Sequence, residues 1–76
     1  MKTVGKENVS KEFGLFIRDV REKTGLLQAE IAEQLGVSRA YYTHIEAGNR
    51  EIYFTMALNI CRILDLDVGE FAKHLK

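Results

Sequence analysis

Apolar residues recur at helical spacing along most of this chain, and the first such segment lies between residues 10 and 25. Its apolar face is formed by Phe13, Ile17, Val20 and Thr24. Intervals of three and four residues predict an amphipathic helix. Ser10 is suited to cap the start of this helix, and Gly25 is suited to end it.

Residues 28–50 contain two short amphipathic segments that are joined by one glycine. The first segment carries Ile31, Ala32 and Leu35 at helical spacing, and the second carries Val37, Tyr42 and Ile45. Gly36 lies where the chain must turn sharply, and glycine enters the left-handed region without steric cost. Ser38 follows as a natural N-cap of the second helix. Two helices joined by a short turn with a glycine form a helix-turn-helix.

The C-terminal third predicts two more helices. A fourth helix runs from about Phe54 to Leu64, and Thr55 is a candidate for a late cap. Its expected inner stripe consists of Phe54, Leu58, Cys61 and Leu64, with Ala57 and Ile60 beside it. Asp67 and Glu70 resemble a capping box at the start of a fifth helix, whose expected buried residues are Val68, Phe71 and Leu75. The polar residues 1–9 are expected to form a flexible arm before a single domain over residues 10–76. We therefore predict an all-α fold, a compact bundle of five helices in which helices 2 and 3 form the helix-turn-helix.

The composition narrows the class of protein further. The chain has 76 residues, of which 46% are apolar, and it has neither a membrane-spanning run nor an apolar signal peptide. A single cysteine, Cys61, excludes an internal disulfide and a thiolate zinc cluster, which favours a cytoplasmic location. His44 and His74 belong to different elements and lack a paired carboxylate or ligand spacing. We therefore expect no enzyme activity, no metal and no cofactor.

Charge by itself does not identify a nucleic-acid partner. Eleven basic and eleven acidic residues give a net charge of zero, whereas nucleic-acid-binding domains are usually basic. The distribution is only mildly uneven, with +2 over residues 1–27 and −2 over residues 28–36.

From Phe13 to about Leu75, the chain resembles the lambda-repressor-like, Xre/Cro-type helix-turn-helix DNA-binding domains. The resemblance is carried by Phe13-Gly14, Ile17-Arg18, Val20-Arg21, Gly25-Leu26, Gln28, Ile31-Ala32, Leu35-Gly36-Val37-Ser38, Ile45-Glu46-Ala47-Gly48-Asn49-Arg50, Leu64, Leu66, Val68 and Phe71. It implies a fold of five helices, in which the helix after Gly36 is the recognition helix. It also implies a sequence-specific transcriptional regulator that reads the DNA major groove.

The outward face of the expected recognition helix holds the candidate base-reading residues. Tyr42 and Ile45 face inward by periodicity, which leaves four outward residues that match the family's base-reading positions: Arg39, Ala40, Thr43 and His44. The guanidinium of Arg39 can bond guanine O6 and N7 together. The alternative is that Arg39 is only a solvated residue of the first turn.

Other residues match positions that contact phosphates or hold the fold together. The resemblance implies phosphate contacts by Gln28, Ser38, Tyr41, Asn49 and Arg50. Gln28 begins a helix, where free N–H groups attract anions; the alternative is a simple polar residue at a helix end. Tyr41 is equally well explained as a half-buried packing residue. Arg21 and Glu46 match an ion pair between helices 1 and 3, which is either buried and stabilising or exposed and weak.

Several residues depart from the family pattern. Leu27 stands where Ser or Thr usually caps the second helix, and Tyr42 replaces a small aliphatic residue, so its hydroxyl requires a partner or water. Ile52 and Tyr53 replace Pro-Ser before the fourth helix, and Asp65 replaces a C-capping glycine. Leu15 and Phe16 are apolar where relatives are usually polar.

The family pairs such domains on palindromic or pseudo-palindromic operators, which implies a homodimer on double-stranded DNA. The expected interface draws on Ile52, Tyr53, Met56, Ile63 and Leu66. Glu33 lies where some family members contact RNA polymerase, although a solvated acidic residue explains it more simply. Size fits a small stand-alone repressor, a restriction–modification controller or an antitoxin, and the sequence does not separate these three. The alternative function is a protein–protein interaction module that has kept the fold and lost DNA binding.

Overall fold

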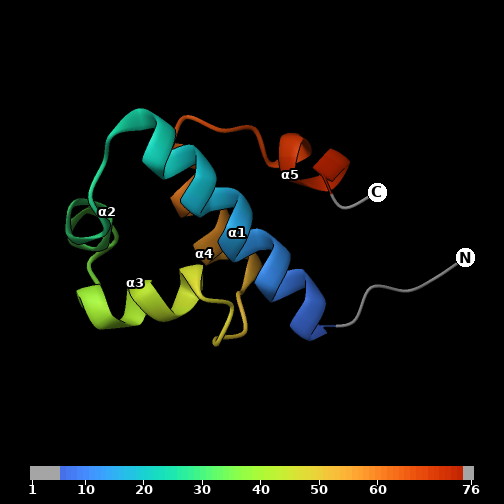
Figure 1. Cartoon of the computed structure of the whole chain (residues 1–76), viewed down its shortest axis with the longest axis horizontal. Coiled ribbons are helices and arrows are strands. Elements are labelled where there is room, and N and C mark those ends of the chain that lie inside the picture. The colour runs from blue at the N-terminus through green and yellow to red at the C-terminus, as the bar shows by residue number, and fades with distance from the viewer. Residues whose placement is uncertain (1–5, 75–76) are drawn as a thin grey trace, which may run out of the picture.

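The computed structural model describes residues 6–74, and all regular elements within them are helices (Figure 1). They are α1 (Lys6–Thr24), α2 (Gln28–Leu35), α3 (Arg39–Glu46), α4 (Phe54–Ile63) and α5 (Val68–His74). The predicted all-α bundle of five helices is therefore confirmed. None of the described helices combines the length and apolar character that a membrane span requires.

The first helix begins earlier than the sequence predicts. It starts at Lys6, so residues 6–9 form its first turn and Ser10 lies inside the helix, where it is only 6% exposed. Nothing between Lys6 and Ser10 is a strong helix breaker, so the good capping residue does not set the boundary. Residues 1–5 of the expected arm lie outside the described part of the chain. Thr24, expected on the inner face, is exposed, and its hydroxyl donates to the Arg21 carbonyl oxygen.

The turn between α2 and α3 follows the predicted chemistry. Gly36 has a φ of 76°, and its N–H and that of Val37 bond carbonyl groups in the last turn of α2. Ser38 is the N-cap of α3, and its hydroxyl oxygen accepts from the Tyr41 N–H at 3.0 Å. The glycine reverses the chain, and the serine starts α3 two residues later.

The core lies where the first four helices meet. It consists of Phe13 and Ile17 from α1, Ile31 and Ala32 from α2, Tyr42 and Ile45 from α3, and Ile60, Cys61 and Leu64 from α4 and its end. From α5, Phe71 adds an edge-to-face contact with Phe13, the ring centroids lying 5.0 Å apart. Phe16, expected at the surface, is half-buried and also packs on Phe71.

The fourth helix covers the core with most of its predicted inner residues. Ala57, Ile60, Cys61 and Leu64 lie in or against the core as expected, but Phe54 is 68% exposed, so the expectation that it faces inward is wrong. Thr55 is not a cap, because α4 begins at Phe54 and Tyr53 is the N-cap, without a side-chain hydrogen bond. At the first turn of a helix, a residue can fit the helical period and still extend past the end of the core.

The fifth helix begins after Asp67, as predicted. The Asp67 carboxylate accepts from the Gly69 N–H at 3.0 Å. The side chain of Val68 and residue Leu75, both expected to be buried, lie outside the described residues.

The helices α1 and α3 approach each other at two glycines. A Cβ atom on Gly14 would lie 2.7 Å from the Ile45 carbonyl oxygen and closer still to that of Glu46. Gly48, just beyond α3, has a φ of 76°, and a Cβ there would lie 2.7 Å from the Cα of Lys11. These glycines let α1 lie directly against the C-terminal end of α3.

Candidate nucleic-acid interface

The outward face of α3 presents the four side chains that the sequence assigns to base reading. Arg39, Ala40, Thr43 and His44 are all exposed, whereas Tyr42 and Ile45 on the opposite face are buried. In Figure 1 α3 lies along the edge of the molecule, with α1 and α2 on its inner side. An exposed helix of eight residues held in this way has the size and placement that a major groove admits.

The C-terminal end of α3 is held by a bidentate ion pair with α1. Arg21 Nε donates to Glu46 Oε2 at 2.6 Å, and Arg21 Nη2 donates to Glu46 Oε1 at 3.1 Å. The two side chains are only 11% and 3% exposed. Arg21 Nη1 also donates to the Leu26 carbonyl oxygen, which ties the α1–α2 connection to the same pair. The two residues that the resemblance relates are thus in contact, and the pair is buried rather than exposed.

Each member of this pair favours the charged form of the other. Burial by itself would raise the pKa of Glu46, but hydrogen bonds from Arg21 and Gln28 outweigh it and hold the pKa below its ordinary value. The hydrogen bond to Glu46 raises the pKa of Arg21 further above its already high value. Glu46 is therefore ionised at neutral pH and serves as a pure hydrogen-bond acceptor.

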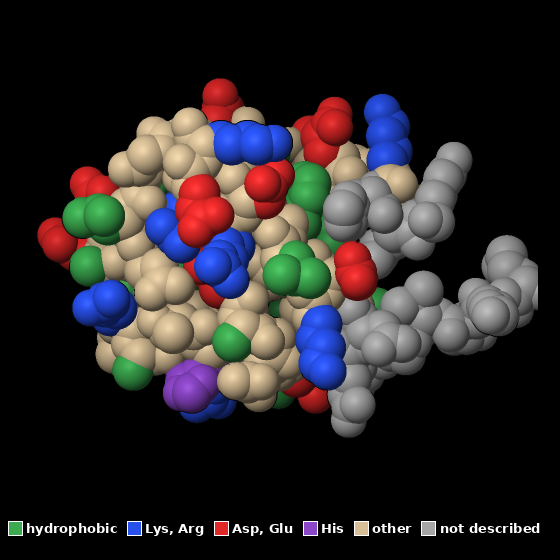
Figure 2. All heavy atoms as spheres, viewed as in Figure 1, with side chains coloured by type: hydrophobic (Ala, Val, Ile, Leu, Met, Phe, Trp, Pro, Cys, Tyr) green, Lys and Arg blue, Asp and Glu red, His purple; other side chains and the backbone are tan. Residues whose placement is uncertain are grey.

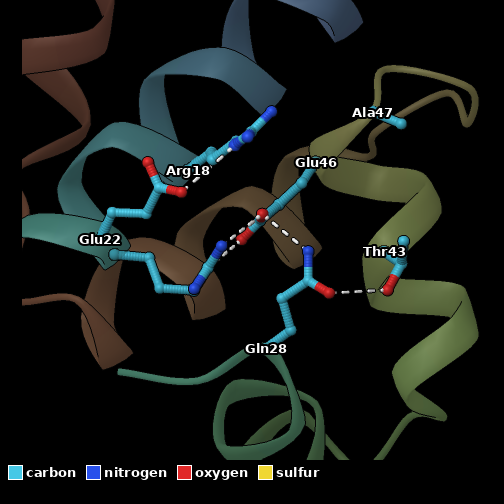
Figure 3. A pocket seen from close by; sticks show the side chains of 7 residues that line it. Arg18, Glu22, Gln28, Thr43, Glu46 and Ala47 are labelled. Atoms are coloured by element: carbon cyan, nitrogen blue, oxygen red, sulfur yellow. Dashed lines mark hydrogen bonds and ion pairs between the residues drawn. The ribbon is translucent and has the colours of Figure 1, made fainter. Parts of the chain in front are cut away.

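Gln28 joins this ion pair to Thr43 on the outward face of α3. Its Nε2 donates to Glu46 Oε1 at 2.9 Å, and its Oε1 accepts from the Thr43 hydroxyl at 2.9 Å. Figure 3 shows Gln28 between Glu46 and Thr43, reaching across from α2 to α3. Because an amide nitrogen carries two hydrogens, one N–H of Gln28 is left for an external acceptor such as a phosphate oxygen.

The remaining predicted phosphate contacts lie at the two ends of α3. Ser38 uses its hydroxyl oxygen as the N-cap. Beyond the other end, Asn49 and Arg50 are exposed, and the Arg50 guanidinium carbon lies 4.5 Å from the centroid of the half-buried Tyr41 ring. Such a cation–π contact holds the guanidinium beside α3.

Tyr42 has an unusual position behind α3. Its side chain is fully buried, and its hydroxyl has no hydrogen-bond partner among the described residues. Burial raises the pKa of this phenol, and the nearby Glu46 carboxylate raises it further, although the geometry of a hydrogen bond between them is not met. The partner that the sequence analysis required for this hydroxyl is therefore not supplied by another described side chain.

The surface seen in Figure 2 mixes positive and negative side chains rather than separating them. On α1, Arg18 and Glu22 form an exposed ion pair at 3.5 Å. This pair borders a hollow that is also lined by Gln28 and Thr43 (Figure 3). Exposed pairs of this kind contribute little to stability. The even mixture agrees with the net charge of zero.

The residues expected at a dimer interface fall into two groups. Ile52, Met56, Ile63 and Leu66 are half-buried and pack against the core of their own chain. Tyr53 is 67% exposed and is followed by the equally exposed Phe54, which the sequence analysis placed inside. The exposed apolar surface beside α4 is therefore centred on Tyr53 and Phe54.

The sequence analysis did not identify the bridge from Gln28 to Thr43. It assigned Gln28 to a phosphate and Thr43 to a base, and it did not relate them to each other. Spacing along the chain carries no signal for this contact, because the residues are fifteen positions apart and on different helices. By contrast, the Arg18–Glu22 pair is visible in the sequence as an i, i+4 spacing of opposite charges.

Comparison with known proteins places this geometry among regulators. A family model described as "Helix-turn-helix domain" matches residues 12–74. An uncharacterized HTH-type transcriptional regulator of Bacillus subtilis, YqaE, is 33% identical over 57 residues; the match covers 75% of this chain and 49% of the relative. The chain thus spans about half the length of that relative.

Two crystal structures of the clp gene regulator ClgR from Corynebacterium glutamicum are also similar. Each is 25% identical with a TM-score of 0.80 over 84% of this chain; the match covers 68% of the first structure's chain and 83% of the second's.

Proposed function

This chain belongs to the helix-turn-helix domain family, and we propose on that basis that it is a sequence-specific DNA-binding transcriptional regulator. In this proposal α3 enters the major groove of double-stranded DNA with Arg39, Ala40, Thr43 and His44 toward the base edges. Gln28, Ser38, Tyr41, Asn49 and Arg50 contact phosphates and set the position of α3. The observation that carries the proposal is the exposed outer face of α3, held by the Arg21–Glu46 pair behind it.

The phosphate contacts gain support from the free bonding capacity of the flanking residues. Gln28 keeps one N–H beyond its bond to Glu46, and the guanidinium of Arg50 is exposed beside Tyr41. Both side chains are oriented by contacts within the domain, so little conformational freedom is lost on binding. Contacts to phosphates position a protein on DNA, and contacts to bases provide the sequence preference.

We propose further that the chain binds as a homodimer on a palindromic or pseudo-palindromic operator and acts as a repressor. The exposed Tyr53 and Phe54 support an interface beside α4, with Met56, Ile52, Ile63 and Leu66 at its margin. Sedimentation velocity between low and high micromolar concentration tests this: a dimer that Tyr53→Ser returns to a monomer is expected. A monomer across the whole range would contradict it. A contact of the exposed Glu33 with RNA polymerase remains a proposal.

The decisive experiment selects binding sites from randomised duplex DNA, followed by sequencing, for the wild type and for Arg39→Ala. A two-fold symmetric motif is expected, and the variant should lose preference at one position in each half. Arg62→Ala on α4 is the matched control and should retain the motif.

The second candidate function is a protein–protein interaction module. The mixed surface charge and the exposed Leu15, Leu27, Tyr53 and Phe54 favour it. Absence of any enriched sequence at low salt, with protein that is folded by circular dichroism, would support this second candidate and contradict the first.

A further inference from the structure

One carboxylate, that of Glu46, fixes the direction of the two hydrogen bonds that lead from it through Gln28 to Thr43. Ionised Glu46 accepts but cannot donate, so Gln28 must turn its amide nitrogen toward Glu46 Oε1. The amide oxygen of Gln28 then faces Thr43, and it can only accept. The Thr43 hydroxyl therefore gives its single hydrogen to Gln28 Oε1, at 2.9 Å (Figure 3).

This arrangement determines what Thr43 offers to an external partner. A hydroxyl has one hydrogen and two lone pairs, and here the hydrogen is used within the protein. The exposed side chain therefore presents acceptor lone pairs and a methyl group outward, but no donor.

We propose that Thr43 is an acceptor-only specificity residue that selects a base with an amino group at its major-groove edge, adenine or cytosine, and rejects guanine. In the major groove adenine N6 and cytosine N4 are donors, whereas guanine O6 and N7 only accept. Because the Thr43 hydroxyl has already donated its hydrogen to Gln28, it can accept from adenine N6 or cytosine N4. Opposite guanine it would place its oxygen lone pairs against the O6 and N7 acceptors, which is unfavourable. The proposal rests on the proposed function, since it requires α3 to lie in the major groove.

Gln28 is in consequence a positioning residue for specificity as well as a candidate for phosphate contact. It touches no base, yet it fixes the side chain that does. Removing its amide frees the Thr43 hydroxyl to rotate and to donate outward, so guanine becomes acceptable at that position. A merely structural or phosphate-binding glutamine would leave the base preference unchanged.

The test measures position-resolved base preferences by selection from randomised duplexes for five proteins: the wild type, Thr43→Val, Thr43→Ser, Gln28→Ala and Gln34→Ala. Thr43→Val keeps the shape and the methyl group but loses the lone pairs. In this variant the preference for the favoured base over guanine should fall about five- to tenfold at one position per half-site, which corresponds to the contribution of one hydrogen bond. Thr43→Ser keeps the hydroxyl and should keep the preference.

Gln28→Ala should weaken binding to all sequences and, in addition, admit guanine at the position that Thr43→Val identifies. Gln34, an exposed glutamine on the same helix, supplies the matched control, and its variant should change neither property. Thermal unfolding of each variant verifies that the domain is folded before binding is measured.

The possible failures are distinguishable. If the wild type enriches no motif, the proposed function itself fails. If a motif appears but the position read by Thr43 is guanine or thymine, neither of which has a donor at its major-groove edge, the inference fails and DNA binding stands. The inference also fails if Thr43→Ser loses the preference while Thr43→Val keeps it, because the methyl group is then the reader. An unchanged preference in Gln28→Ala likewise overturns it.

Discussion

Glu46 is the acceptor on which side chains from two neighbouring helices converge. It accepts hydrogen bonds from Arg21 and Gln28, and it lies close to the Tyr42 phenol. One acidic residue thus connects three helices behind the surface that α3 presents. Changes to it should affect stability and its pH dependence more than any exposed acid does.

Glu46→Gln should destabilise the domain at neutral pH by about 3 kcal/mol, because the buried Arg21 loses its countercharge. The pKa of Glu46 is lowered in the folded state, so its ionic contribution is present above its ordinary pKa of 4.5 and is lost as the pH falls through the folded value. The stability difference between wild type and variant should therefore narrow below about pH 4.5. Urea unfolding at pH 7 and pH 3.5 measures the stability difference, and Glu33→Gln at an exposed site is the surface control.

Tyr42→Phe should leave stability at pH 7 within about 1 kcal/mol of the wild type, because the buried hydroxyl has no hydrogen bond to lose. Burial raises the pKa of Tyr42 on folding, so the phenol has no effect on the pH dependence below its ordinary pKa of 10.0, and the folded state loses stability as the pH rises beyond that value. The variant should therefore resist alkaline unfolding better. Urea unfolding at pH 7 and pH 10.5 tests this against the exposed Tyr53→Phe. A loss above 2 kcal/mol at pH 7 would show that the hydroxyl is bonded.

Helix ends and helix crossings decide how these side chains are brought together. The close approach of α1 to α3 depends on Gly14, because a Cβ atom there would collide with backbone carbonyl groups of α3. Backbone atoms, unlike a side chain, cannot avoid such a collision by changing rotamer. The start of α2 is less well made, because Leu27 is its N-cap and provides no acceptor. Glu30 supplies half of a capping box by accepting from the Leu27 N–H at 2.8 Å.

Gly14→Ala should destabilise the domain by roughly 1–3 kcal/mol, although alanine is the better helix former, because α1 must move away from α3. The same substitution at Gly69 of α5, where the new Cβ would meet only ordinary contacts, should be neutral or stabilising by up to about 1 kcal/mol. Chemical denaturation of both variants compares them directly. Equal effects at the two glycines would contradict the close crossing.

Leu27→Ser should stabilise the domain by about 1 kcal/mol, since its hydroxyl can accept from the Glu30 N–H and complete the capping box. Leu27 is 63% exposed, so little buried apolar area is lost. A rise in the melting temperature of about 4–8 °C is expected for a domain of this size. Leu27→Ala, which lacks the acceptor, should give no rise.

The helix boundaries show which features could be predicted from the sequence and which could not. The turn at Gly36 and the caps at Ser38 and Asp67 were predicted correctly, because each depends on chemistry local to a few residues. Phe54 and Ser10 were misplaced, because the position of the core and the extent of α1 depend on contacts between distant segments. The Gln28–Thr43 bridge was missed for the same reason.

The chain as a whole carries no excess positive charge, and the face shown in Figure 2 mixes the two signs. Electrostatic attraction that is independent of sequence should therefore be weak, and affinity for DNA should depend on a small number of well-placed contacts. This distribution favours specific over non-specific binding. If only a few phosphates are contacted, each contact should account for a measurable fraction of the slope of log affinity against log salt.

Arg50→Ala should weaken binding to all DNA sequences about equally and reduce the slope of log affinity against log salt by about 1 per protomer. The reason is that one phosphate neutralised by Arg50 no longer releases its counterion. Fluorescence anisotropy on the selected operator between 50 and 200 mM salt, roughly the range in which such slopes are resolved, measures it. Arg62→Ala on α4 should leave the slope unchanged; an equal change in both variants would indicate a general charge effect.

The Gln28–Thr43 bridge also bears on how a recognition surface of this kind can diverge. Among the described residues, no side-chain hydrogen bond ties Arg39, Ala40 or His44 to the rest of the domain, so exchanging any one of them should cost little folding stability. Position 43 is different, because a residue without a donor there breaks the bond to the Gln28 amide oxygen. If α3 reads DNA as proposed, an exchange at position 43 therefore also changes how Gln28 on α2 is held, whereas exchanges at the other three positions do not.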